Sequence, residues 1–229
     1  MLKIIRYAVI VLLAAIGGLW AHAWFTHAPG QSVADAFGQR LAQVFGQDMA
    51  VPSAAGVVQL PPGISLGGAF SLTRQDGVAV TERDYAGQWL LIYFGFTYCP
   101  DVCPTELGRM ADVMDVLGPL AGRVTPVFIT IDPERDRPGN LADYVSRFHP
   151  RLQGLTGTTE QIAAVARQFR VFYARANSPN STEYLMDHSS FIYLVGPDNR
   201  VRSLFRPDTA VEGIARMITG QVRAVSTPQ

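Results

Sequence analysis

The chain has 229 residues, of which 48% are hydrophobic, and 19 basic side chains balance 19 acidic ones to a formal net charge of zero. This size allows one domain with a full hydrophobic core plus extensions. The sequence contains no basic block, so we expect no nucleic-acid partner. Its two cysteines exclude a fold that is held together by several disulfides.

The first 25 residues (1–25) predict a membrane anchor. Residues 7–25 carry no formal charge, and a bilayer-spanning helix needs roughly 20 such residues. Lys3 and Arg6 precede this run, and by the positive-inside rule they place the rest of the chain outside the cytoplasm. The alternative is a cleaved signal peptide, because residues 21–23 ("AHA") have the form of a cleavage site. We expect a single-pass protein of the inner (cytoplasmic) membrane with its domain facing the periplasm.

A linker over residues 26–60 follows the anchor. Apolar side chains at helical spacing between residues 32 and 47 are typical of a short amphipathic helix. A stretch rich in Gly and Pro at 57–68 marks the entrance to the folded domain, which we expect to occupy residues 61–225.

The domain begins with a predicted hairpin and then alternates strands and helices. Apolar runs at 70–73 and 78–81 flank an Asp-Gly turn, which is typical of a β-hairpin. "WLLIYFGF" (89–96) predicts a strand that is buried on both faces. The remaining predicted elements are a helix over 103–118, a buried strand over 123–131, helices over 139–148 and 158–169 (Thr158 and Gln161 forming a capping box), two strands with a turn over 189–205, and a closing helix over 209–225.

This order places parallel strands with crossover helices first and an antiparallel pair last. We therefore predict an α/β, thioredoxin-like fold with an N-terminal hairpin extension, preceded by a single N-terminal transmembrane helix. In such sheets chemistry collects at the carboxyl edge of the strands.

Both cysteines lie in "GFTYCPDVCPTE" (95–106), between the first buried strand and the next helix. We expect Cys103 in the first helical turn, where free amides and the helix dipole would lower its pKa below the usual value of about 8.5. Three residues separate it from Cys99, so this loop is wider than that of a redox CxxC motif. Both sulfurs can then face one ion and can still join in a disulfide.

Three roles for the pair remain to be compared. A purely structural disulfide across so short a loop would contribute only about 2 kcal/mol and would tie no distant segments together. A redox couple fits an exported domain. A peroxidatic cysteine is disfavoured because Pro100 stands where peroxiredoxins have Thr or Ser, three residues before Cys103.

A metal site is the third role, and it requires a further ligand. Two thiolates are soft donors that suit Cu(I). His188 stands just before a predicted buried strand, and in a thioredoxin topology this position lies opposite the cysteine loop. Zinc would need a fourth ligand, and none is evident.

Two carboxylates are candidates for supporting roles around this site. Asp187 could orient the imidazole of His188 or the loop. Asp132 ends the second buried strand and would face the cysteine loop, where a functional polar loop and a solvated turn are equally good interpretations. The charged neighbours that we expect to form a solvated turn, paired with each other or with water, are Glu134, Arg135, Asp136 and Arg137.

Four segments resemble the Sco/SenC family of copper proteins that assist cytochrome c oxidase assembly. They are "YFGFTYCPDVCPTEL" (93–107), "VFITIDPERDRP" (127–138), "FHPRLQGLTGT" (148–158) and "DHSSFIYLVGPDNRV" (187–201). The resemblance implies a thioredoxin fold behind a membrane anchor, with Cys99, Cys103 and His188 as ligands of Cu(I) and also Cu(II). The family often has histidine where this chain has Tyr98, a difference that leaves all three ligand positions intact.

The resemblance also implies partners and a function. The expected copper acceptor is the dinuclear copper site of cytochrome c oxidase subunit II, and a copper donor or a thiol reductant protein is a further expected partner. The first hypothesis is a membrane-anchored copper metallochaperone whose cysteine pair is gated by its redox state. The alternative is a thiol-disulfide oxidoreductase that reduces the copper-ligand cysteines of the oxidase, and whether the protein is an enzyme stays open between them.

Overall fold

The computed structural model describes residues 56–60, 64–176 and 184–226, together with the isolated positions 6 and 18. The chain divides into two compact units, Met1–Pro52 and Ser53–Gln229, and the fold described below belongs to the second. The predicted anchor and the predicted linker helix lie outside the described residues, apart from Arg6 and Gly18. In the ranges that the structure describes, no helix is both long and apolar enough to cross a membrane.

The core of the domain is an eight-stranded mixed sheet in the order β1-β10-β9-β4-β5-β6-β2-β3. Its central strands β4 and β5 are buried along their whole length, as their continuous apolar runs predict. β4 runs parallel to β5 and β5 parallel to β6, whereas β9 is antiparallel to both β4 and β10. The strands of this sheet are β1 (Val57–Val58), β2 (Ser71–Arg74), β3 (Ala79–Thr81), β4 (Trp89–Gly95), β5 (Val124–Thr130), β6 (Gln153–Thr156), β9 (Ile192–Val195) and β10 (Val201–Phe205).

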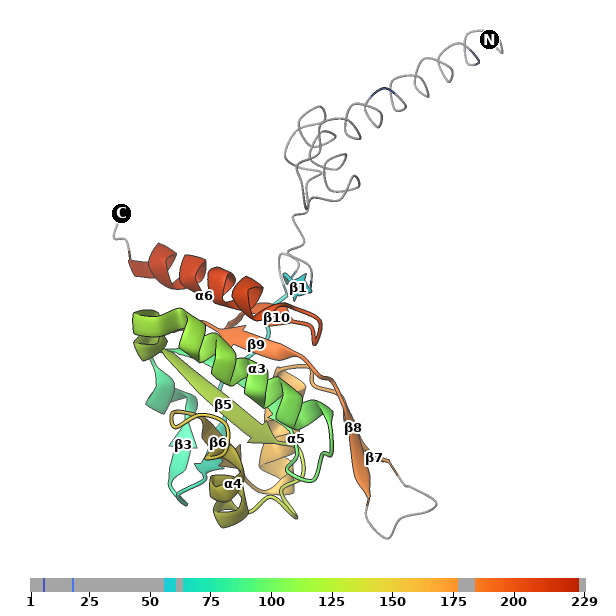
Figure 1. Cartoon of the computed structure of the whole chain (residues 1–229). Coiled ribbons are helices and arrows are strands. Elements are labelled where there is room, and N and C mark those ends of the chain that lie inside the picture. Colours follow the sequence, from blue (N-terminus) through green and yellow to red (C-terminus); the bar gives the residue numbers. More distant parts are fainter. Residues whose placement is uncertain (1–5, 7–17, 19–55, 61–63, 177–183, 227–229) are drawn as a thin grey trace. The chain divides into compact units, whose positions relative to one another are not determined.

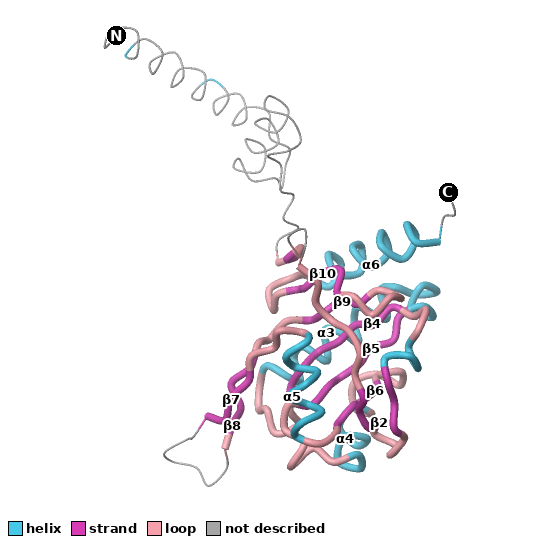
Figure 2. Tube along the Cα trace, turned by 180° about the vertical axis from the view of Figure 1, so that it is seen from behind, coloured by secondary structure: helices cyan, strands magenta, loops and turns pink. Residues whose placement is uncertain are grey.

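Helices cover both faces of this sheet. α3 (Val102–Leu117) and α6 (Val211–Ser226) pack side by side on one face (Figure 1), and α5 (Thr159–Gln168) lies on the opposite face, toward the viewer in Figure 2. Thr158 and Gln161 form the predicted capping box at the start of α5. The remaining helices are α4 (Pro138–Val145) and the short 3-10 helices η2 (Glu82–Tyr85) and η3 (Gly118–Arg123). The predicted α/β, thioredoxin-like arrangement is confirmed.

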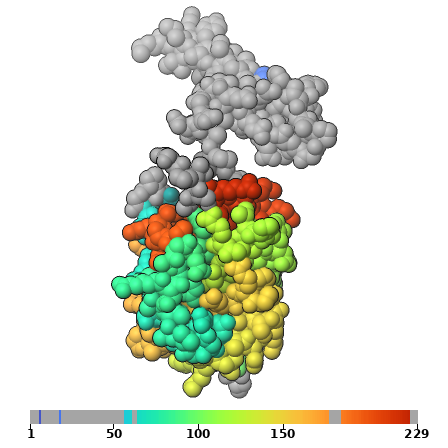
Figure 3. Space-filling view, turned by 90° about the vertical axis from the view of Figure 1, so that its left-hand side faces the viewer, coloured from blue at the N-terminus to red at the C-terminus, as the bar shows by residue number. Residues whose placement is uncertain are grey.

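The predicted hairpin is β2–β3, and it extends the sheet at the edge beyond β6. In Figure 3 this hairpin, in teal and green, lies next to the yellow surface of the α4–β6 region. β6 itself was not predicted. It is only four residues long, and its sequence (QGLT) has no clear apolar alternation, so no local pattern indicates a strand. Gly154 in this strand packs against Leu141 and Val145 of α4.

A second, two-stranded sheet was also not predicted. β7 (Tyr173–Ala176) pairs with β8 (Leu185–His188) in a hairpin that projects from the body of the domain (Figures 1 and 2). His188 is therefore the last residue of a separate short strand, and β9 begins only at Ile192, three residues later than the predicted start of its strand at 189.

Strand direction brings three segments to one edge of the main sheet. The cysteine loop (residues 96–103) follows the carboxyl end of β4, and the β5–α4 loop (residues 131–137) follows the carboxyl end of the parallel strand β5. β9 runs antiparallel to β4, so the segment that enters β9, which contains His188, starts at the same edge. Topology alone therefore places the two cysteines, the β5–α4 loop and His188 close together.

Candidate metal centre

Cys99 lies over the amino-terminal end of α3. A turn in which the Cys99 amide donates to the Phe96 carbonyl (3.2 Å) leads into the helix, whose N-cap residue is Asp101. The amide of Cys103 belongs to the first helical turn, where amides have no partner inside the helix. It donates instead to the sulfur of Cys99 at 3.4 Å.

Cys103 turns its own side chain into the core, where it is fully buried. Its sulfur rests on the backbone of β4 at Gly95, where an added Cβ would lie 2.8 Å from that sulfur and 2.9 Å from the ring of Phe128. The hydroxyl of Tyr93 reaches the same sulfur at 4.0 Å. Glycine is therefore needed at position 95 because any side chain there would displace the thiol.

The two thiols have opposite acidities. The side-chain hydrogen bond from the thiol of Cys103 is the largest influence that lowers the pKa of Cys99 to about 4; His188 and nearby backbone amides act in the same direction, and burial opposes them. The same bond to Cys99, together with burial, raises the pKa of Cys103. The prediction that the pKa of Cys103 is lowered is therefore wrong, because the thiol of Cys103 is buried and hydrogen-bonded to Cys99, and the amide of Cys103 also points at Cys99.

His188 closes the site from the other side. Its Nε2 lies 3.5 Å from the sulfur of Cys103, and its Nδ1 lies 3.1 Å from the carbonyl oxygen of Ser189. A carbonyl only accepts, so the Ser189 bond requires a hydrogen on Nδ1, and in the neutral ring the lone pair of Nε2 then faces the sulfur. The ring stands edge-on to Tyr93 and Phe96, which fix its plane.

The two candidate carboxylates differ in their surroundings. Asp187 is exposed, and the carbonyl of Ser189 takes the position at Nδ1, so Asp187 is not the group that orients the imidazole in this structure. Asp132 is buried, and its carboxylate accepts from the hydroxyl of Tyr184 (2.8 Å) and from Nε of Arg135 (2.5 Å). Asp132 therefore acts on the β7–β8 hairpin at Tyr184, which precedes β8 at the end of the hairpin opposite His188.

Asp136 is a site-supporting residue that the sequence interpretation missed. Its buried carboxylate accepts from the amide of Thr97 (3.0 Å), from the hydroxyl of Thr97 (2.5 Å) and from the hydroxyl of Thr130 (2.6 Å). Burial raises the pKa of Asp136, and the bonds from the two threonines oppose this rise. The expectation of a solvated turn is wrong for Asp136 and for Arg135, whose largely buried side chain pairs with Asp132, and it holds for the exposed Glu134 and Arg137.

The only sequence signal for Asp136 was Thr97, a hydrogen-bonding residue two positions before Cys99. A carboxylate that is buried by tertiary contacts has the same sequence pattern as one in a solvated turn, so the pattern could not separate the two.

The geometry therefore joins two sulfurs and one imidazole from segments that are distant in sequence. Within the described ranges no group of three or more His, Cys, Asp or Glu side chains is already spaced as a formed metal site. The sulfur of Cys103 lies 3.5 Å from Nε2 of His188, and the backbone amide of Cys103 lies 3.4 Å from the sulfur of Cys99. This set of soft and borderline donors fits Cu(I) or Cu(II), and the ligand role of the three residues stays a prediction.

Several known proteins are similar to this chain in sequence and in fold. The human mitochondrial SCO1 homolog is 46% identical over 160 residues, which cover 69% of this chain and 53% of the human protein. The copper-bound crystal structure of Arabidopsis thaliana ScoI is 41% identical with a TM-score of 0.66, and the match covers 69% of this chain and 99% of that chain. The structure of Bradyrhizobium japonicum ScoI with copper bound is 40% identical with a TM-score of 0.63, covering 67% and 98%.

The match spans about half the length of the human relative. The SCO1/SenC family model matches residues 59–223, and the chain therefore belongs to the SCO1/SenC family.

Proposed function

We propose that this domain binds copper through Cys99, Cys103 and His188 and delivers it to another protein. The observation that carries the proposal is the meeting of Nε2 of His188 with the sulfur of Cys103 at 3.5 Å, beside the sulfur of Cys99. The family to which the chain belongs takes part in copper delivery and cytochrome c oxidase assembly, and related ScoI proteins are known with copper bound.

Copper transfer follows from the chemistry of these three donors. Cys99 offers a thiolate at neutral pH, Cys103 gives up its proton as the metal binds, and the lone pair of Nε2 is already turned inward. Three ligands leave copper with an open side, where ligands of an acceptor can enter and take the ion by exchange. The acceptor that we propose is the dinuclear copper site of cytochrome c oxidase subunit II.

Oxidation of the cysteine pair would gate this transfer. When Cys99 and Cys103 join in a disulfide, both thiolates disappear and two electrons pass to a partner disulfide, which becomes two thiols. Copper then loses two of its three ligands and leaves. A thiol reductant must restore the pair before the next loading.

The test is copper affinity of the reduced protein, measured by competition with a chelator. Cys99→Ser, Cys103→Ser and His188→Ala should each weaken binding by more than about tenfold, because each removes a directly bonded donor. His149→Ala is the matched control, since the ring of His149 accepts a hydrogen bond from the amide of Arg151 in its own loop. Unchanged affinity in the His188 variant would contradict the three-ligand site.

A thiol-disulfide reductase is the second candidate, and the asymmetry of the two thiols favours it. Half-buried Cys99, with its low pKa, suits attack on a partner disulfide, and buried Cys103 behind it suits resolution of the mixed disulfide. A reductase needs both cysteines but not His188. Full oxidase assembly in cells that carry only the His188→Ala variant would support the reductase and contradict the chaperone.

We also propose that residues 7–25 anchor the protein in the inner membrane, with the domain in the periplasm. The proposal rests on the uncharged run and on the preceding Lys3 and Arg6. Cell fractionation combined with amino-terminal sequencing tests it. A soluble protein that begins after residue 23 would show a cleaved signal peptide instead.

A further inference from the structure

His188 stands on an element outside the main sheet. β7 and β8 pair only with each other, and His188 is the last residue of β8, opposite Tyr173. Directly after β8, the amide of Ser189 donates to the carbonyl of Phe172, the residue before β7 (3.0 Å). No backbone ladder of the main sheet therefore holds the proposed ligand in place within the described part of the chain, and side-chain contacts must do so.

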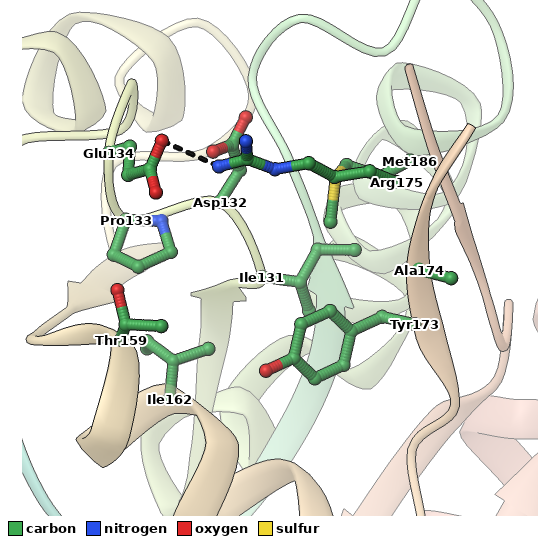
Figure 4. A pocket seen from close by; sticks show the side chains of 10 residues that line it. All are labelled: Ile131, Asp132, Pro133, Glu134, Thr159, Ile162, Tyr173, Ala174, Arg175 and Met186. Carbon is green, nitrogen blue, oxygen red and sulfur yellow. Dashed lines mark ion pairs between the residues drawn. The ribbon is translucent and has the colours of Figure 1, made fainter. Parts of the chain in front are cut away.

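Packing between this hairpin and the body of the domain is incomplete. A pocket of about 120 Å³ lies between the β5–α4 loop, the start of α5 and the hairpin (Figure 4). Its walls come from all three elements: Ile131, Asp132, Pro133, Glu134, Thr159, Ile162, Tyr173, Ala174, Arg175 and Met186. Met186 of β8 is buried in the core, but the pocket beside it leaves part of this contact unfilled, so polar contacts can also help to set the position of the hairpin.

Arg135 contacts the hairpin and the cysteine loop at the same time. On the hairpin side its Nη1 donates to the carbonyl of Tyr184 (3.1 Å), and its guanidinium lies 3.7 Å from the centre of the Tyr184 ring. On the other side the guanidinium lies 4.5 Å from the ring centre of Tyr98 and 5.9 Å from that of Phe96, the residues on either side of Thr97. Asp132, which is buried, holds both Arg135 and the hydroxyl of Tyr184.

A second arginine near the same ring makes a useful contrast. Arg175 lies 4.4 Å from the ring centre of Tyr184 and pairs with Glu134, and this ion pair is drawn in Figure 4. Both partners are at least half exposed, whereas the side chain of Arg135 is 16% exposed and that of Asp132 is 2% exposed. Exposed pairs of this kind contribute little, so the buried pair is the one that can define geometry.

We propose that Arg135 is a positioning residue for the metal centre: by joining Tyr184 to the cysteine loop, it sets where His188 lies relative to Cys99 and Cys103. This inference rests on the proposed copper-binding function. It extends that function by assigning Arg135, which is not one of the three proposed donors, a specific part in bringing them together.

The decisive experiment is a double-mutant cycle on copper affinity in the reduced protein. Arg135→Met should weaken binding by about ten- to a hundredfold, the range found when groups that orient metal ligands are removed. In a His188→Ala background the same change should have an effect within about twofold, because no imidazole is left to position. An equal loss in both backgrounds would overturn the proposal, since Arg135 would then act through the cysteine loop or the fold. No loss in either background would overturn it as well.

Two further variants keep the test clear. Arg175→Met is the matched control, because Arg175 lies beside the same ring but pairs with the exposed Glu134. The copper affinity of this variant should stay within about twofold of that of the wild type. Tyr184→Leu removes the ring and hydroxyl that Arg135 and Asp132 hold, and it should reproduce the loss seen with Arg135→Met. This variant decides the question if Arg135→Met does not fold.

A measurement without copper separates this inference from the proposed function. In the reduced protein free of metal, Arg135→Met should speed hydrogen exchange of the β7–β8 amides and leave that of β4 and β5 unchanged. Unchanged exchange in the hairpin would overturn the positioning role even if copper binding is confirmed. If the wild-type protein fails to bind copper, the proposed function fails, and hydrogen exchange still decides whether Arg135 holds the hairpin.

Discussion

At the scale of single residues, two chemically identical side chains acquire different properties. Cys99 sits outside the helix and receives the free amide of Cys103, whereas the thiol of Cys103 is buried against Gly95. Thiolates form most readily where amide donors point at the sulfur and water still reaches it, and that position belongs to Cys99. The sequence alone could place both residues near a helix start but could not say which sulfur faces the amides.

The alkylation of the reduced, metal-free protein should reveal this difference. Because its pKa is lowered to about 4, Cys99 should react with iodoacetamide at a rate that changes little between about pH 6 and about pH 8. For an ordinary thiol, the alkylation rate would fall by about tenfold for each unit by which the pH is lowered in this range. Peptide mass spectrometry should find Cys99 modified first and Cys103 protected. If the alkylation rate of Cys99 falls about tenfold for each unit by which the pH is lowered, its pKa is not lowered.

At the scale of elements, the β5–α4 loop supports the site by holding two neighbours. Asp136 fastens the cysteine loop through Thr97, and Asp132 with Arg135 fastens the β7–β8 hairpin through Tyr184. One loop therefore sets the spacing between the segments that carry the cysteines and His188. A charged turn in the sequence proved to be the structural support of the site.

Removing the buried carboxylate should loosen the cysteine loop. Asp136→Ala leaves the amide and hydroxyl of Thr97 and the hydroxyl of Thr130 without their acceptor, and unfolding free energy should fall by about 1–3 kcal/mol. Urea unfolding measures this change, and copper affinity should fall with it. Asp143→Ala, an exposed aspartate on the neighbouring helix α4, is the control and should change stability by less than about 0.5 kcal/mol. Equal stability of the two variants would contradict the supporting role of Asp136.

At the scale of the whole domain, Arg109 links α3 to the segment that leads into α6. Arg109 binds the buried carboxylate of Glu106 (2.6 Å) and donates to the carbonyls of Pro207 (2.6 Å) and Thr209. The helix that begins at the cysteines is therefore fastened to the last helix of the fold. Burial raises the pKa of Glu106, and its bond to Arg109 opposes that rise.

Loss of this arginine should destabilise the domain in a way that depends on pH. Arg109→Met leaves Glu106 buried without its counter-charge, and the domain should lose about 3–5 kcal/mol of unfolding free energy at neutral pH. The pKa of Glu106 would then rise further in the folded state, so the folded protein binds a proton that the unfolded protein releases. Stability should therefore be partly recovered as the pH falls toward 5 and be lost as it rises.

Urea unfolding at both pH values measures this effect. The double variant Glu106→Gln with Arg109→Met has no charge left to bury, so it should be more stable than the single variant at neutral pH and show a smaller dependence on pH. A single variant whose stability is the same at both pH values would contradict this role of Glu106.

The order of the central elements could be predicted from the sequence, because continuous apolar runs and helical spacing are local properties. The sequence also indicated Cys99, Cys103 and His188, because strand direction in this topology brings their segments to one sheet edge. Three features are visible only in the folded domain: the pKa is lowered at Cys99 and not at Cys103, Asp136 is buried while Asp187 is exposed, and His188 stands on a separate hairpin. Burial, side-chain direction and hydrogen-bond partners arise from contacts between residues far apart in the chain, and no local pattern records them.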